Sequence, residues 1–209
     1  MREFNLLVKY PQPSERILLN RTIEHRILAS YRGMDFFDGA RFTGYGGMNY
    51  DGRWKPTAEF VIQEYAPKKV IQFASEKGFL LKELDELGVE VVGVDSSSYA
   101  RSRALVKTVP ALPTDQLVPF DLALGLGVVY TLPLDQAMNC IRKMEQVAHK
   151  AFITLAAYET QEDYWLFKQW TLLGCTILKK DEWIEVLKHC GYTGDYWFVN
   201  AKYLGLREP

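Results

Sequence analysis

Residues 70–81 read VIQFASEKGFLL, and residues 90–95 read EVVGVD. The first stretch predicts a short buried strand that ends at Phe73, then a turn and a helix, because an apolar run is followed by apolar residues at helical spacing. The second stretch predicts another buried strand, which ends at Asp95. Two strands separated by a helix indicate a parallel pair joined by a right-handed crossover. These residues therefore decide the fold class, which is α/β.

The same alternation of strand and helix continues to the end of the chain. The pattern predicts further strands over residues 105–109, 120–126, 151–155, 196–199 and 202–206. It predicts helices over residues 22–32, 56–65, 77–87, 97–104, 134–148, 160–170 and 181–190. Such a pattern is typical of a Rossmann-like, doubly wound parallel sheet with helices on both faces, in which ligands bind at the carboxyl ends of the strands.

The composition changes near residue 55. Residues 41–54 read RFTGYGGMNYDGRW, which is rich in glycine and aromatic residues and has no helical period. We therefore expect a helical extension with a glycine–aromatic lid segment over residues 1–54, and one compact Rossmann-like domain over residues 55–209. The alternative to a lid is a packed loop in which Trp54 fills the core and Arg53 pairs with Asp51.

Charge and cysteine content narrow the function. The 209 residues include 25 basic and 26 acidic ones, so the formal net charge of −1 predicts no attraction to nucleic acid or to an anionic membrane. Three cysteines in unrelated contexts fit a reducing compartment. The first nine residues lack the apolar stretch of a signal peptide, and there is no run of 18 apolar residues, so we expect a cytoplasmic protein.

Several kinds of site are not supported by the sequence. The histidines His25, His149 and His189 are far apart, and no paired metal ligands accompany them, so no metal site is expected. The first loop lacks the glycine pattern of nicotinamide-binding folds. No Gly-x-Ser-x-Gly elbow is present, which argues against a serine hydrolase.

The residues that follow the first two strands are the main candidate site. A tight turn before a helix brings backbone N–H groups and the helix dipole toward an anionic ligand group. Asp95 ends the next strand, where a carboxylate is placed to accept both hydroxyls of a ribose. The alternative is an ordinary loop with a solvated aspartate.

The chain resembles the class I S-adenosylmethionine (SAM)-dependent methyltransferases over residues 20–200. FLLKEL at 79–84, VVGVD at 91–95 and PFDLAL at 119–124 match the first, second and fourth motifs of that family in outline. A small bacterial subgroup is indicated by GYGG at 44–47 with YDGRW at 50–54, KAFIT at 150–154 and GYTGDY at 191–196.

The resemblance implies SAM as cofactor and in-line methyl transfer. The near-neutral charge and the aromatic lid favour a small molecule as the acceptor. The residues that the resemblance assigns to the cofactor are Tyr45, Phe73, Ala74, Ser75, Gly78, Asp95, Ser96 and Leu126. The candidates for substrate binding are Asp51, Arg53, Tyr130 and Tyr158, and Tyr158 is also the candidate catalytic residue. Tyr158 follows the fifth strand of the alternating pattern, at the carboxyl edge, where a plain edge aromatic is the alternative. The expected partners beyond the substrate are a second copy of the chain or a related methyltransferase subunit.

The first motif departs from the family pattern at three positions. Gln72 replaces an acid that helps to hold the cofactor's ammonium group, and Ala74 and Glu76 replace the first two glycines. Ala74 is a mild change only if its backbone is not at positive φ. Glu76 adds bulk and negative charge where the cofactor's carboxylate would lie, unless it points to solvent and pairs with Lys77.

The third motif is altered as well. The acid that the family places near the adenine has no clear counterpart, although Asp115 lies in the corresponding link. A second hypothesis therefore stands beside the enzyme: a non-catalytic methyltransferase fold with an eroded cofactor loop, which serves as a binding or partner subunit.

Overall fold

Strand β2 (Lys69–Phe73) lies in the middle of a parallel sheet. The computed structural model describes residues 1–7, 20–112 and 119–206, and in it β2 pairs with β3 (Glu90–Val94) on one side and with β5 (Phe120–Gly125) on the other. The strand order is β1-β8-β6-β5-β2-β3-β4, with β7 paired to β6 off this path. The remaining strands are β1 (Arg2–Glu3), β4 (Thr108–Val109), β6 (Ala148–Tyr158), β7 (Leu178–Lys179) and β8 (Asp195–Val199).

The order of the strands creates a crevice at the carboxyl end of the sheet. The chain runs outward from β2 through β3 to β4 and then returns to the other side of β2 as β5. Loops that follow β2 and β5 therefore diverge above the point where the order reverses, which is where open α/β sheets bind ligands.

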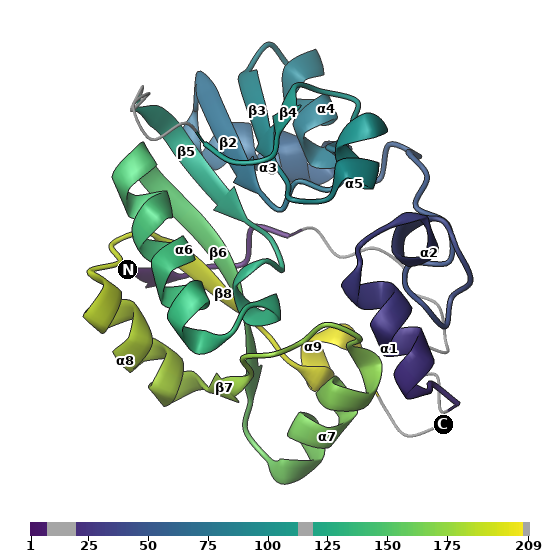
Figure 1. The fold of residues 1–209 in the computed structure, drawn as a ribbon. Helices are drawn as coiled ribbons and strands as arrows, with labels where there is room; N and C mark the ends of the chain where they lie inside the picture. Colours follow the sequence, from purple (N-terminus) through teal and green to yellow (C-terminus); the bar gives the residue numbers. More distant parts are fainter. Residues whose placement is uncertain (8–19, 113–118, 207–209) are drawn as a thin grey trace.

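Side chains alternate between the two faces of the sheet. Val70 and Leu122 lie in the core on one face, with α3 (Lys55–Tyr65) and α4 (Phe79–Glu86). Ile71 and Ala123 face the other side, with α6 (Leu134–Val147) and α8 (Lys180–Cys190). Figure 1 shows α6 and α8 together on one face of the sheet, and α3 and α4 on the opposite one. The expected Rossmann-like sheet with helices on both faces is confirmed.

The shorter helices surround the carboxyl ends of the strands. At one side α1 (Ile23–Ser30) and α2 (Met34–Phe37) pack against α5 (Ser98–Ser102), and at another α7 (Gln161–Trp170) packs against α9 (Ala201–Leu204) (Figure 1). A single 3₁₀ turn, Val129–Thr131, follows β5.

Most predicted elements are present, and one is wrong. Residues 202–206 do not form a strand: the side chain of Asn200 accepts the N–H of Tyr203 at 2.7 Å and starts helix α9, which ends at Gly205 in the left-handed region (φ 66°). The predicted helix over residues 22–32 ends at Ser30, because Arg32 has a φ of 47°. The sequence pattern does not predict the edge strand β1, which pairs with β8. The division of the chain at residue 54 remains a prediction.

Among the helices that the structure describes, none is long and apolar enough to cross a membrane.

Candidate functional site

The loop after β2 keeps a left-handed backbone without most of its glycines. Ala74 has a φ of 49°, Glu76 of 55° and Gly78 of 74°. The left-handed region costs an L-residue about 1–2 kcal/mol. The condition under which Ala74 would be a mild change is therefore not met, yet the backbone holds the conformation that glycines would favour.

Hydrogen bonds hold this loop in place. The carboxylate of Asp95 accepts the N–H of Glu76 at 2.8 Å through Oδ2 and the N–H of Ser97 at 2.8 Å through Oδ1. The N–H of Ser75 donates to the carbonyl of Val94 at 3.1 Å. Asp95 is 4% exposed, so its charge is satisfied by the protein's own backbone.

Two polar atoms near the loop are buried without a partner. Oε1 of Gln72 and Oγ of Ser75 make no hydrogen bond to the residues that the structure describes. An unsatisfied buried polar atom costs about 1–3 kcal/mol. Neither residue lines the cavity that is described below, and Oγ of Ser75 is turned toward Gly93 of β3.

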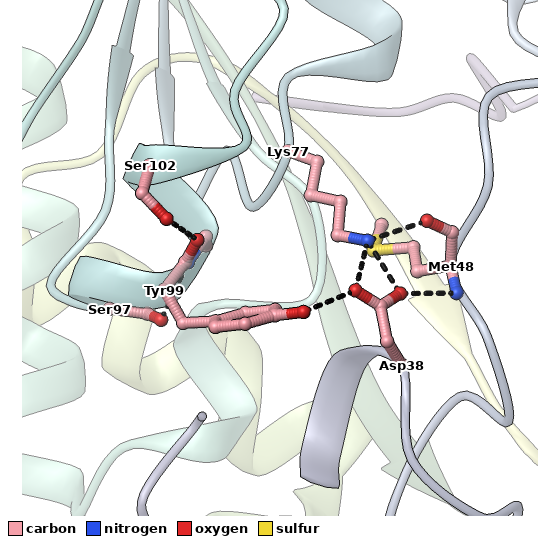
Figure 2. Close-up of polar contacts among 7 residues, drawn as sticks. Asp38, Met48, Lys77, Ser97, Tyr99 and Ser102 are labelled. Carbon is pink, nitrogen blue, oxygen red and sulfur yellow. Dashed lines mark hydrogen bonds and ion pairs between the residues drawn. The ribbon is translucent and has the colours of Figure 1, made fainter. Parts of the chain in front are cut away.

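A buried ion pair joins the loop to the N-terminal segment. Nζ of Lys77 donates to both carboxylate oxygens of Asp38, at 2.6 and 2.8 Å, and to the carbonyl of Met48 at 2.8 Å. The hydroxyl of Tyr99, on α5, donates to the same carboxylate at 2.7 Å, as Figure 2 shows. Burial by itself would raise the pKa of Asp38, but the hydrogen bonds from Lys77 and Tyr99 lower it overall. The sequence-based alternative in which Lys77 pairs with Glu76 is wrong, because Asp38 takes that partner.

A cavity of about 680 Å³ opens at the carboxyl ends of β2 and β5. Its walls come from five parts of the chain: the N-terminal segment, the loop after β2, the loop after β5, the residues that follow α7, and α9. The volume falls within the range of about 300–1,000 Å³ that is usual for small-molecule sites.

Glu76 is the only acidic residue that lines this cavity within the described ranges. Its Oε1 accepts a short hydrogen bond from the hydroxyl of Tyr45, whose ring packs on Phe36 at 5.1 Å. Burial is the main cause that raises the pKa of Glu76 to about 7; nearby Asp95 raises it further, whereas Tyr45, Arg32 and Lys77 oppose the rise. Glu76 therefore exchanges a proton near neutral pH, inside the cavity.

The structure places the predicted site residues in two groups. The cavity is lined by Tyr45, Ala74, Leu126, Arg53 and Tyr130. The described part of its wall does not include Phe73, Ser75, Gly78, Asp95, Ser96, Asp51 or Tyr158.

The residues outside the cavity wall have other contacts. Asp51 pairs with Arg53, whose Nε donates to the carboxylate at 2.8 Å. Tyr158 packs against Tyr164, with ring centroids 5.2 Å apart. Asp115 lies outside the described residues. The roles of all these residues remain predictions.

The sequence motifs did not point to much of the cavity wall. Arg21, Arg32 and Arg41 come from the N-terminal segment, and residues 170–173 and 202–205 come from the C-terminal part. The sequence signal that could have indicated a cationic wall is the group of arginines at positions 21, 26, 32 and 41.

Comparison with known proteins rests on structure alone. No protein-family model and no curated sequence matches the chain. The N-terminal domain of EvdMO1, solved with SAH bound, is similar at a TM-score of 0.52 and 14% identity over 85% of this chain and 89% of that one. The complex between the Haloferax volcanii Trm112 methyltransferase activator and the putative methyltransferase gives a TM-score of 0.52 and 14% identity over 80% of this chain and 76% of that one.

A putative O-methyltransferase from Nostoc punctiforme PCC 73102 is also similar, at a TM-score of 0.51 and 17% identity. The match covers 67% of this chain and 49% of that one, so it spans about half the length of that protein. The chain has the class I methyltransferase fold. Within this methyltransferase fold, the cavity occupies the carboxyl edge where β2 and β5 diverge.

The ion pair between Lys77 and Asp38 predicts a large loss of stability when it is broken. Replacement Lys77→Met leaves a partly buried carboxylate unpaired, and we expect the free energy of unfolding to fall by about 2–4 kcal/mol. The matched control is Lys188→Met, which breaks an exposed pair with Glu185 and should cost less than about 1 kcal/mol. Urea titration measures both, and equal effects would contradict a stabilising role of the buried pair.

The left-handed backbone of Ala74 predicts that glycine is stabilising there. Replacement Ala74→Gly relieves the strain, and we expect a gain of about 1 kcal/mol in the free energy of unfolding. Ala104 is outside the positive-φ region, so Ala104→Gly should instead lose up to about 1 kcal/mol. Thermal unfolding of the two variants compares them, and a loss in both would refute the strain at Ala74.

The raised pKa of Glu76 predicts a stability that declines with pH. The folded protein binds this proton more tightly than the unfolded chain, so the contribution is complete below the unfolded pKa of 4.5 and is lost as the pH rises through about 7. Urea titrations at about pH 5 and about pH 8 should show Glu76→Gln gaining on the wild type by at most about 3 kcal/mol, with less where cavity water solvates the carboxylate. A constant difference at both pH values would show that Glu76 titrates normally.

Proposed function

We propose that the chain is a SAM-dependent methyltransferase that acts on a small molecule. The observation that carries the proposal is the loop after β2: its backbone keeps the left-handed turns at Ala74 and Glu76, at a cost in strain, and it opens into the cavity. Strain that persists at the mouth of a cavity is typical of functional sites. The fold and the SAH-bound EvdMO1 domain support the same assignment.

The residues of the loop fit the methionine end of SAM. The resemblance assigns the cofactor's ammonium group to an acid at position 72, where this chain has Gln72. Glu76 follows four residues further along the chain. Its carboxylate lines the cavity, where it can pair with a bound cation. We infer that Glu76 takes over the pairing with the ammonium group and that its hydrogen bond to Tyr45 holds it there.

Bound SAM would supply an electrophilic methyl group. The chain's own contribution is to position the acceptor in line and to exclude water, and proximity and orientation together are worth about 7–11 kcal/mol of the barrier. Tyr45, Tyr130 and Glu76 line the same space. Tyr158 packs against Tyr164, outside the described cavity wall, so its position does not support a role as the group that accepts a proton.

One observation favours the second candidate, a non-catalytic binding or partner subunit. Both carboxylate oxygens of Asp95 accept backbone N–H groups, and the residue is nearly fully buried. Asp95 also lies outside the described cavity wall, so in this conformation its carboxylate is not presented to a ligand in the cavity. The segment that covers it includes Ser97, whose hydroxyl donates to the carbonyl of Arg32 at 2.6 Å. The complex with the Trm112 activator is an example of a partnered methyltransferase in this fold.

Calorimetric titration of S-adenosylhomocysteine, the demethylated product, into the purified chain distinguishes the two functions. We expect micromolar binding at about pH 8, where Glu76 is ionised, and weaker binding at about pH 6. Replacement Glu76→Gln should weaken binding by about 10-fold or more at the higher pH and should remove the pH dependence, because a charge-assisted hydrogen bond is worth about 1.5–3 kcal/mol.

Glu86→Gln is the matched control. Glu86 is on α4, outside the cavity, and pairs with Lys82 at the surface. This variant should bind like the wild type. Absence of binding at millimolar ligand would reject the methyltransferase and favour the partner subunit, and equal binding by Glu76→Gln would reject the role of Glu76 while retaining the enzyme.

A further inference from the structure

The charge of the cavity differs from that of the whole chain. The chain has a formal net charge of −1, but among the described residues the cavity is lined by Arg21, Arg32, Arg41, Arg53 and Lys202, with Glu76 as the one acid. Arg53 has Asp51 as a partner. The other three arginines make no ion pair with a carboxylate of the described residues. The part of the cavity wall that comes from the N-terminal segment is therefore strongly cationic.

Arg21 and Arg41 are held by carbonyl groups. Nη1 of Arg21 donates to the carbonyl of Trp170 at 2.6 Å, and its Nη2 donates to the carbonyl of Arg41 at 3.3 Å. Nη1 of Arg41 donates to the carbonyl of Gly44 at 2.5 Å. These dipoles orient the two guanidinium groups without neutralising them. Nε of Arg21 is buried and makes no hydrogen bond to a described residue.

The two arginines also repel each other. Burial, followed by the charges of Arg41 and Arg26, lowers the pKa of Arg21 to about 10, and burial lowers the pKa of Arg41 as well. Both remain cationic at neutral pH. Arg21 is half-buried and Arg41 is exposed, and neither pairs with a carboxylate of the described residues, so a bound anion would neutralise charges that the cavity leaves unpaired. Clusters of this kind in a cleft are candidates for functional sites.

The rest of this wall suits a flat or apolar ligand body. Phe36, Trp170, Leu172 and Leu173 line the cavity beside the arginines. The guanidinium fork matches the planar geometry of a carboxylate or the oxygens of a phosphate, with which it forms paired hydrogen bonds. Glu76 lies on the wall formed by the loop after β2, so the cavity offers a negative group on one side and positive groups on another.

We propose that Arg21 and Arg41 bind an anionic group, a carboxylate or a phosphate, of the methyl acceptor. This inference rests on the proposed function, because it assigns the anion to the acceptor and not to the cofactor. It identifies the substrate class as acidic small molecules with an apolar body. Uncharged acceptors would leave the two arginines unpaired and are expected to bind poorly.

Inorganic phosphate and acetate are suitable probes, titrated by calorimetry at constant ionic strength. We expect wild-type protein to bind at least one of them in the millimolar range, and Arg41→Gln to bind it about 10-fold more weakly, since each charge-assisted contact is worth about 1.5–3 kcal/mol. The preferred probe distinguishes a phosphate from a carboxylate. Saturating S-adenosylhomocysteine should leave the affinity unchanged, because the cofactor occupies the other wall.

Two further variants separate the loss of a positive charge from the loss of the guanidinium geometry. Arg142→Gln removes an arginine from α6, away from the cavity, and should bind the probe like the wild type. Arg21→Lys keeps the charge but loses the fork, and it should weaken binding by less than Arg41→Gln does. Thermal unfolding in probe-free buffer shows whether each variant is folded.

The outcomes separate this inference from the proposed function. Equal binding by wild type and a folded Arg41→Gln, or no binding of either probe at tens of millimolar, would overturn the anion site. Displacement of the probe by S-adenosylhomocysteine would assign the arginines to the cofactor's carboxylate and would also overturn the inference. Probe binding without any binding of S-adenosylhomocysteine would reject the methyltransferase and leave an anion site in a binding protein.

Discussion

The carboxylate of Asp95 holds the backbone of two loops at the carboxyl end of the sheet. It accepts one N–H from the loop after β2 and one from the turn that leads into α5, each at 2.8 Å. These hydrogen bonds keep Glu76 in the left-handed region and leave its side chain in the cavity. The same loop presents Lys77 to Asp38. The strained turn, the cavity and the position of the N-terminal segment therefore all depend on one buried carboxylate.

The loop after β2 departs from the family pattern in residues more than in conformation. Alanine and glutamate occupy positions that glycine would take, and the backbone accepts the strain because hydrogen bonds on both sides determine it. From the sequence, the negative charge of Glu76 is expected to repel a ligand carboxylate. In the structure, Glu76 lies in a cavity whose other charged lining residues, among those described, are arginines and a lysine. The replacement of a motif glycine by Glu76 therefore also changes the charge that the cavity presents to a ligand.

The N-terminal segment forms part of the wall of the site and does not only lie over it as a lid. Its arginines reach the carbonyls of residues 170 and 172, and Asp38 joins it to the loop after β2. The segment and the sheet thereby form one continuous wall. Selectivity for the charge of a ligand then comes from the segment, whereas the sheet supplies the position.

The amino-acid sequence by itself determined the fold class, because apolar runs of strand length that alternate with amphipathic helices require a parallel sheet covered on both faces. It also pointed to the loop after β2, and of the residues it singled out for the site, Tyr45, Ala74, Leu126, Arg53 and Tyr130 line the cavity, while their roles remain predictions. Only the structure showed that residues 202–204 belong to helix α9, because the apolar pattern of that stretch is too short to distinguish a helix from a strand. Only the tertiary structure showed that Asp95 is turned inward and that Arg21 and Arg41 lie together, because the contacts of Asp95 with Glu76 and of Arg21 with Arg41 join residues 19 and 20 positions apart and leave no periodic signal along the chain.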